Sequence, residues 1–206
     1  MSSGITEIAL VLEDGSVFEG ESFGHVPAGG IAAGEVVFNT TLTGYQEVIS
    51  DPSYAGQIIT FTTAHIGNYG ATALDAESRG TFARGVIVRD MARRHSNWRS
   101  EQSLDAMLKY FNVPGIGGLD TRRLTRLLRD SGSLRGAFGT ADEKTLLAAA
   151  QAERGTSGIN LVADVTTPQA YTYGDGKFSV VAYDFGIKTT ILRCLSEIAT
   201  VTVVPA

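Results

Sequence analysis

Phe178-Ser-Val-Val-Ala-Tyr183 decides the fold class, because this short apolar run has the composition of a buried β-strand. Residues 187–195 then carry apolar side chains at helical spacing, and residues 200–204 form a second apolar run. A strand, a helix and a strand within about thirty residues predict the opening βαβ unit of an α/β sheet. One such unit cannot cover both faces of its own sheet, so we expect the sequence to contain only the start of this second domain.

The stretch before this unit is polar and rich in turn residues. Residues 156–177 are dominated by Thr, Ser, Gly, Pro and Tyr, a composition that is typical of an interdomain linker. We therefore predict an N-terminal domain over residues 1–155, a linker over residues 156–177, and an incomplete second domain over residues 178–206.

The N-terminal domain shows strand patterns before helical ones. Apolar runs predict strands at residues 8–12, 17–18, 35–39, 57–62 and 85–88. The first two are separated by Asp14-Gly15, which is a strong hairpin signal. Three helices are predicted to follow, and the first has one apolar face made of Leu104, Met107, Leu108 and Phe111.

The second and third helices are expected to begin at capping residues. Asp120 can cap the second helix, which reaches Gly132. Thr140 followed by Glu143 has the spacing of a capping box and predicts the start of the third helix.

Composition limits the functions that this chain can have. It has 206 residues, 43% hydrophobic and 19% charged, with a formal net charge of -5, as is typical of a soluble globular protein. The weak negative charge argues against a nucleic-acid binder. No apolar run approaches the ~20 residues of a membrane span, and the N-terminus lacks a signal-peptide pattern. We predict a cytoplasmic protein with no membrane or nucleic-acid partner.

The usual catalytic and metal-binding residue types give little signal here. Cys194 is the one cysteine, and it lies in the middle of a predicted helix without flanking glycines. We expect it to be a buried structural residue rather than a nucleophile. His25, His65 and His95 lack metal-ligand spacing, so we predict no metal site. His65, in a glycine-flanked loop, is the most site-like, but a structural or interface role is expected.

Arginines form a stripe on the second helix. Arg122, Arg126 and Arg129 have i, i+4, i+7 spacing, with Arg123 beside them. A second basic stretch contains Arg93, Arg94 and Arg99. From spacing alone, a solvated helix face and a docking surface for an acidic partner are equally good interpretations.

Four stretches in the N-terminal half together resemble one family, the small subunit of carbamoyl-phosphate synthetase. They are Gly34-Glu-Val-Val-Phe-Asn-Thr-Thr-Leu-Thr-Gly-Tyr-Gln-Glu47, Asp51-Pro-Ser-Tyr54, His65-Ile-Gly-Asn68 and Asp120-Thr-Arg-Arg-Leu-Thr-Arg126. The stretch Val180-Val-Ala-Tyr-Asp-Phe-Gly-Ile-Lys188 is similar to the first strand and turn of that subunit's class I glutamine amidotransferase domain. The resemblance covers essentially the whole chain.

The resemblance implies both a fold and a function. It implies an N-terminal three-layer β/β/α domain, which helps to bind the large synthetase subunit in a heterodimer. It also implies glutamine hydrolysis by the C-terminal domain, with the ammonia passing to the large subunit. That subunit, a ligase, uses bicarbonate, ATP and Mg to make carbamoyl phosphate for arginine and pyrimidine synthesis. No cofactor is expected on this chain itself.

The residues that carry the family's chemistry are expected to lie beyond residue 206. Amide hydrolysis needs a thiolate, a base and oxyanion donors, and no cysteine elbow occurs in this sequence. The resemblance therefore implies no catalytic residue in residues 1–206, and we expect this part alone to be inactive. It implies one substrate contact, because the serine of the Asp-Pro-Ser-Tyr segment, here Ser53, reaches the bound L-glutamine. Without the resemblance, residues 51–53 are simply a turn.

Two other functions stay open at this point. The chain could be a non-catalytic interaction module with a vestigial second domain. It could also be an unrelated nucleotide-binding α/β protein, although Gly29-Gly30 lacks the Lys-Ser/Thr of a phosphate loop and precedes a strand.

Overall fold

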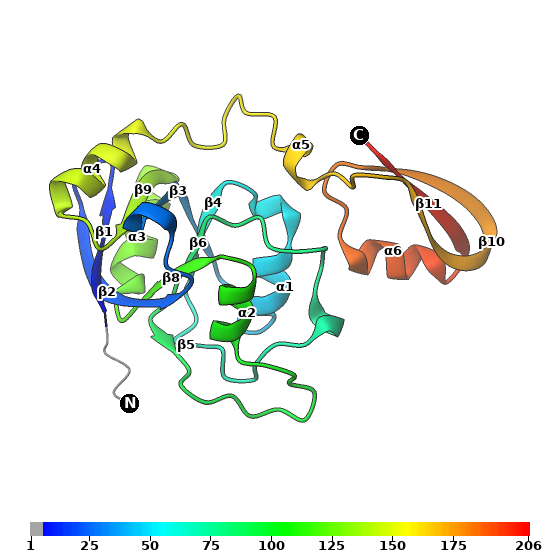
Figure 1. The fold of residues 1–206 in the computed structure, drawn as a ribbon, viewed down its shortest axis with the longest axis horizontal. Helices are drawn as coiled ribbons and strands as arrows, with labels where there is room; N and C mark the ends of the chain where they lie inside the picture. The colour runs from blue at the N-terminus through cyan, green and yellow to red at the C-terminus, as the bar shows by residue number, and fades with distance from the viewer. Residues whose placement is uncertain (1–5) are drawn as a thin grey trace.

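Seven strands of the N-terminal half pair edge to edge into a closed barrel, in a computed structural model that describes residues 6–206 (Figure 1). Around the barrel the order is β1-β2-β8-β6-β4-β3-β9, and β9 closes the ring by pairing with β1. The strands are β1 (Glu7–Leu12), β2 (Val17–Gly24), β3 (Ile31–Asn39), β4 (Gln57–Phe61), β6 (Gly85–Ile87), β8 (Pro114–Gly117) and β9 (Leu134–Gly139).

The barrel mixes antiparallel and parallel pairs. β1 and β2 form the predicted hairpin, in which the Ser16 N–H donates to Asp14 Oδ1 at 2.8 Å and Gly15 has φ +86°. β3, β4, β6 and β8 are successive parallel neighbours. β9 runs antiparallel to both β1 and β3. The strand predictions for the first half of the chain are confirmed, with boundaries that differ by a few residues.

Strands β8 and β9 were not predicted from the sequence. Both are rich in glycine, which weakens an apolar strand pattern. The barrel needs these glycines, because a Cβ on Gly115 would lie 2.2 Å from the Phe23 ring and one on Gly136 would lie 2.6 Å from Val36. Close packing between strands therefore requires glycine at these positions, and the glycines interrupt the apolar pattern by which a strand is predicted.

The barrel interior is one apolar core to which every strand contributes. Its members are buried side chains such as Leu10, Phe18, Val36, Ile58, Ile87, Ile116 and Phe138. Leu124 and Leu128 of α3 (Thr121–Ser131) join the same cluster, so this helix is held by its apolar face. The opposite face of α3, which carries the arginines, is left for solvent.

Other helices cover the outside of the barrel. α4 (Glu143–Ala152) packs Leu146 and Ala150 against Val11 and Ala137. α1 (Tyr45–Ser50) and α2 (Leu104–Tyr110) bury Ile49 and Leu108 in a third cluster with β4 and β6. A small parallel pair, β5 (His65–Ile66) and β7 (Asp90–Met91), completes this side.

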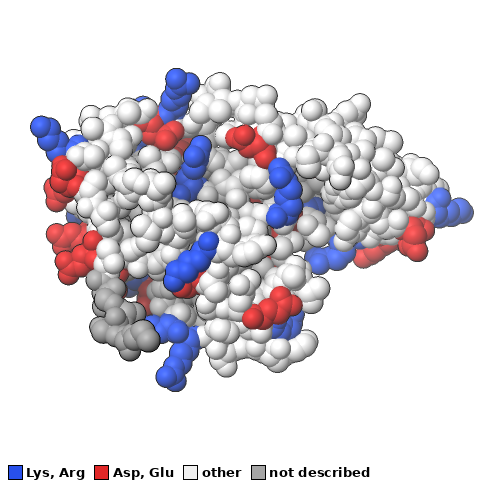
Figure 2. Space-filling view, in the orientation of Figure 1, with Lys and Arg blue, Asp and Glu red and all other residues white. Residues whose placement is uncertain are grey.

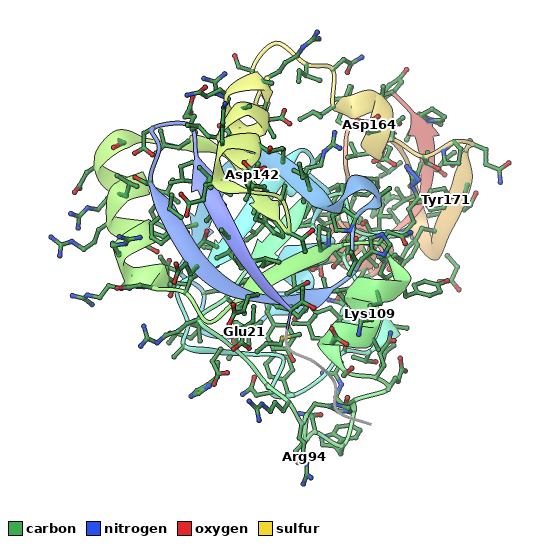
Figure 3. All side chains as sticks on the ribbon, turned by 60° about the vertical axis from the view of Figure 1, so that its left-hand side comes forward. Glu21, Arg94, Lys109, Asp142, Asp164 and Tyr171 are labelled. Atoms are coloured by element: carbon green, nitrogen blue, oxygen red, sulfur yellow. The ribbon has the colours of Figure 1, made fainter. Side chains whose placement is uncertain are left out.

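The predicted helix caps are half right. Asp120 Oδ1 accepts from the Arg123 N–H at 2.9 Å, so the cap on α3 is confirmed. The cap on α4 is Asp142, which accepts from the Thr145 N–H at 3.0 Å and is labelled in Figure 3. The predicted Thr140 cap is wrong. Thr140 directly follows β9, and its N–H donates to the Gly30 carbonyl.

The C-terminal βαβ unit is present as predicted. It consists of β10 (Tyr171–Asp184), α6 (Thr189–Ser196) and β11 (Ala199–Pro205), and β10 runs parallel to β11 over Phe178–Asp184. β10 begins inside the stretch predicted as linker. Its first residues, Tyr171–Tyr173, pair with Val201–Val203 of β11 in the opposite direction to the rest of the strand. The chain turns back at Gly174, φ +76°. The remaining connection contains the short α5 (Val162–Val165).

One face of the C-terminal sheet is covered and the other is bare. α6 packs Leu192 against Val201 and Val203, which are fully buried. On the other face Val181, Tyr183 and Phe185 are each about two-thirds exposed. This confirms the expectation that one βαβ unit leaves a sheet face open. Figure 2 shows the lobe beyond the linker as largely uncharged on the side in view.

The mixed α/β class is confirmed, but the three-layer β/β/α arrangement is not. Pairing runs unbroken around all seven N-terminal strands, so two separate sheet layers are not distinguished. None of the helices within residues 6–206 combines the length and apolar character needed to cross a membrane.

Candidate functional site

Ser53 lies where the barrel domain meets the C-terminal unit. It sits in a 3-10 turn, Pro52–Tyr54, that follows α1, and its side chain is exposed. Asp51 holds the turn, because its Oδ1 accepts from the Ser53 N–H at 2.9 Å. Tyr54 is tied to β3 through a 2.9 Å hydrogen bond from Asn39 Nδ2 to its hydroxyl. The turn is thus anchored on both sides, and the Ser53 side chain between them is exposed.

The residues that follow β10 lie against this turn. Lys188 Nζ is 3.3 Å from Asp51 Oδ2, and a Cβ on Gly186 would lie 3.3 Å from Pro52 Cβ. Gly186 has φ +100°, so this sharp bend requires glycine. The structure therefore brings the segment at residues 51–53 next to residues 186–188, although more than 130 positions separate them in the sequence.

Asp184 fixes the shape of the bend. It is buried at the carboxyl end of β10, and its Oδ1 accepts from the N–H groups of Gly186 and Ile187 at 2.9 and 2.8 Å. Its Oδ2 accepts from the Thr167 N–H at 2.8 Å. In open α/β sheets, ligands bind beyond the carboxyl ends of the strands, and this is the edge that faces the turn carrying Ser53.

Glu77 joins the two units by capping α6 from outside. α6 has no side-chain cap of its own. Glu77 Oε2 accepts from the Thr190 N–H at 2.9 Å, Oε1 accepts from the Thr190 hydroxyl at 2.6 Å, and its carbonyl accepts from the Thr189 N–H at 2.7 Å. A carboxylate at a helix N-terminus satisfies free N–H groups and suits the helix dipole.

We predict that Glu77→Ala loosens α6 and leaves the barrel intact. Loss of an N-cap costs about 0.5–2 kcal/mol, so the amides of α6 should exchange with solvent roughly two- to thirtyfold faster. Hydrogen exchange read by mass spectrometry measures this. The matched control is Asp142→Ala, which removes the acidic cap of α4 and should speed exchange in α4 only. Unchanged exchange in α6 of Glu77→Ala would show that the junction does not hold the helix.

The other candidate residues stay apart from this junction. Cys194 is exposed, so the prediction of a buried cysteine is wrong. The reason is that α6 turns Leu192 and Leu195 toward the sheet, while Cys194 lies on the uncovered side. His65 Nδ1 lies 2.9 Å from Asp90 Oδ2 at an exposed position. Among residues 6–206, no three acidic, His or Cys side chains gather into a potential metal site.

The basic stripe divides into two parts. The Arg123 guanidinium lies 4.0 Å from the centre of the Phe18 ring and donates to the Val17 carbonyl at 2.6 Å, so it packs against the barrel. The other three arginines of α3 line a cavity together with Thr62 and Thr125. In the second stretch, Arg99 pairs with Asp75 at 2.6 Å.

One polar cluster was missed by the sequence analysis. The Tyr45 and Tyr69 rings stack at 4.1 Å, and the Tyr69 hydroxyl accepts from the Gly44 N–H at 2.6 Å. Burial raises the pKa of Glu47 on the same helix, and the Asp75 carboxylate acts in the same direction. These contacts tie α1, which precedes the Ser53 turn, to the loop after β5. Sequence order gave no sign that these segments meet.

Comparison with known proteins identifies relatives of this chain. Residues 10–138 match the family model described as carbamoyl-phosphate synthase small chain, CPSase domain. A carbamoyl phosphate synthase small chain of Xanthomonas campestris pv. campestris is 49% identical over 96% of this chain and 56% of its own length. One of Chlorobaculum tepidum is 49% identical over 96% of this chain and 54% of its own length. The chain spans about half the length of the curated relatives it matches.

Similarity to solved structures is weak. An aminopeptidase from Aneurinibacillus sp. strain AM-1 aligns over 98% of this chain and 49% of its own, with 12% identity and a TM-score of 0.40. That similarity is too low to support an argument about fold or function.

Proposed function

The chain belongs to the carbamoyl-phosphate synthase small-chain family, and from this membership we infer that it works in glutamine-dependent synthesis of carbamoyl phosphate. In this proposal the complete subunit releases ammonia from L-glutamine. A large subunit combines the ammonia with bicarbonate, using ATP and Mg that it binds itself. The chain described here binds no cofactor. The product supplies arginine and pyrimidine synthesis.

The observation that carries the proposal is the 49% identity over nearly the whole chain to proteins named as small chains of this synthase. The geometry of the junction adds support. A ligand at the carboxyl edge of β10 would have the turn of residues 51–53 beside it, since Lys188 and Gly186 already contact that turn. A serine hydroxyl can donate to a carboxylate and accept from an ammonium group, as the amino-acid end of glutamine requires.

We assign separate roles to the two units. Residues 1–155, which contain the seven-stranded barrel, carry the docking surface for the large subunit in a heterodimer. Residues 178–206 form the first βαβ unit of a class I glutamine amidotransferase domain, and Ser53 contributes to its substrate site across the junction. No residue of the catalytic triad is assigned within residues 1–206. The cytoplasm is the compartment where these substrates meet.

A non-catalytic interaction module with a vestigial second domain is the alternative. Reconstitution separates the two. The complete subunit that contains this sequence is purified with its large subunit and supplied with bicarbonate and ATP. Glutamine should support carbamoyl phosphate formation, and ammonia should replace it. A complex that forms product from ammonia but never from glutamine would support the interaction module and contradict the proposal. Residues 1–206 alone should release no ammonia, because their one cysteine lies within a helix.

A further inference from the structure

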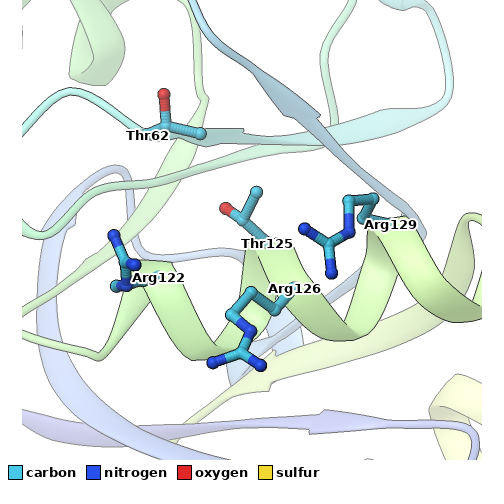
Figure 4. Close-up of a pocket in the computed structure, with 5 residues that line it drawn as sticks. All are labelled: Thr62, Arg122, Thr125, Arg126 and Arg129. Atoms are coloured by element: carbon cyan, nitrogen blue, oxygen red, sulfur yellow. The ribbon is translucent and has the colours of Figure 1, made fainter.

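The arginine face of α3 borders a cavity with an unusual lining. The cavity has a volume of about 460 Å³ and lies between α3 and the residue that follows β4. It is lined by Thr62, Arg122, Thr125, Arg126 and Arg129 (Figure 4). None of these side chains is acidic, although the chain as a whole has a formal net charge of -5. A local concentration of positive charge on an acidic protein favours an anionic partner.

The arginines of this cavity are available for a partner. Arg122, Arg126 and Arg129 are exposed. Of the three, Arg129 pairs with Asp130, the next residue, at 2.8 Å. Within residues 6–206, Arg122 and Arg126 make no ion pair or side-chain hydrogen bond. Arg123 differs, because the barrel surface already holds its guanidinium.

Thr125 gives a second, independent sign of a ligand. Its hydroxyl oxygen is buried and has no hydrogen-bond partner in the described part of the chain. A helical threonine usually satisfies its hydroxyl on the carbonyl four residues earlier, and a buried hydroxyl left unpaired is unfavourable. Figure 4 shows Thr125 facing Thr62 between Arg122 and Arg129. Because this oxygen is closed off from solvent, a group that enters between the two threonines can accept from it once the side chains around it shift.

The spacing of the arginines indicates the size of the ligand. Residues 122 and 129 are seven positions apart, so their Cα atoms are about 10 Å apart along the helix. In Figure 4 Arg126 points away from Thr62, so the three guanidinium groups do not converge on one point. A single phosphate or carboxylate cannot contact all three. Carboxylates on successive turns of a helix, at i, i+4 and i+7, would match the spacing.

We propose that this face of α3 is a docking surface for an acidic helical segment of a partner protein. In the docked state successive carboxylates pair with Arg122, Arg126 and Arg129, and one beside the cavity also accepts from the Thr125 hydroxyl. Arginine is suited to this role, because its planar fork binds carboxylates through two hydrogen bonds. The inference does not need the glutamine chemistry. Under the proposed function, the acidic segment would belong to the large subunit.

The test uses the 206-residue chain and a fluorescein-labelled helical peptide with glutamates at i, i+4 and i+7. Fluorescence anisotropy should show binding that weakens as salt rises. Arg122→Glu/Arg126→Glu should weaken it by about tenfold or more. The matched control is Arg93→Glu/Arg94→Glu, which changes the net charge equally. Arg93 and Arg94 are exposed, and Arg94 projects from a loop far from α3 (Figure 3). This control should stay within about twofold.

Thr125→Val separates docking from folding. The substitution keeps the shape and removes the unpaired hydroxyl, so the free chain should unfold at a higher temperature while binding of the peptide weakens by about threefold. Three results would overturn the proposal. The first is that the glutamate peptide does not bind, and the second is that both double variants lose the same peptide affinity. The third is that inorganic phosphate binds more tightly than the peptide and that Arg122→Glu/Arg126→Glu abolishes this phosphate binding. The last would indicate a small-anion site.

Discussion

Replacing Gly139 with alanine should destabilise the barrel by about 3 kcal/mol or more. Gly139 ends β9, where it faces both Ala9 of β1 and Ile31 of β3. A Cβ there would lie 1.9 Å from the Gly30 carbonyl oxygen. Because the clash is with backbone, no change of rotamer relieves it, and the strands that close the barrel must move apart. Urea unfolding followed by circular dichroism measures the loss.

Gly29→Ala is the matched control for this experiment. Gly29 also has a positive φ, +77°, but a Cβ on it meets nothing within 4 Å among residues 6–206. Its substitution should cost only the left-handed backbone penalty, about 1–2 kcal/mol. If the two variants lost the same stability, the contact between β9 and the Gly30 carbonyl would not be close enough to exclude a side chain, which would contradict the prediction.

Much of the fold was predictable because local signals agreed with tertiary structure. The apolar runs at residues 178–183 and 200–204 with the helix between them gave the βαβ unit, and Asp120 gave the start of α3. Strands β8 and β9 were hidden, since Gly115 and Gly136 leave room for Phe23 and Val36. Those requirements are set by residues far away in the sequence, and a local pattern does not contain them.

The site was less predictable than the fold. Ser53 was proposed only through the family resemblance, because residues 51–53 read locally as a turn, which they are. Glu77 gave no signal, because a helix cap from another domain does not lie at a fixed number of residues before the helix. Cys194 was misjudged because helical position does not tell which face a neighbouring layer covers. The junction is formed by contacts that only the folded chain brings together.

Under the proposed function, the junction would let a barrel residue contact the substrate of the other unit. Asp51 and Glu77 hold Lys188 and Thr190, at the start of α6. The Ser53 turn is therefore fixed relative to the carboxyl end of β10, and a ligand there would be contacted from both units. If the turn does contact the substrate, removal of the Ser53 hydroxyl should have a large effect.

Ser53→Ala in the complete subunit should reduce kcat/KM for glutamine roughly ten- to a hundredfold. The substitution removes a hydrogen bond to a charged group of the substrate, worth about 1.5–3 kcal/mol. The Ser53 side chain is exposed and its backbone N–H still donates to Asp51, so the fold should be unaffected. Thr145→Val is a matched control, since it removes a hydroxyl on α4 that bonds Asp142, away from the junction.

The most direct measurement compares glutamine-supported with ammonia-supported carbamoyl phosphate formation by the same Ser53→Ala complex. We expect the rate with glutamine to fall and the rate with ammonia to stay unchanged, because ammonia reaches the large subunit without using the glutamine site. Unchanged glutamine kinetics would remove Ser53 from the site, and an equal loss of both rates would show that Ser53 supports folding or assembly instead.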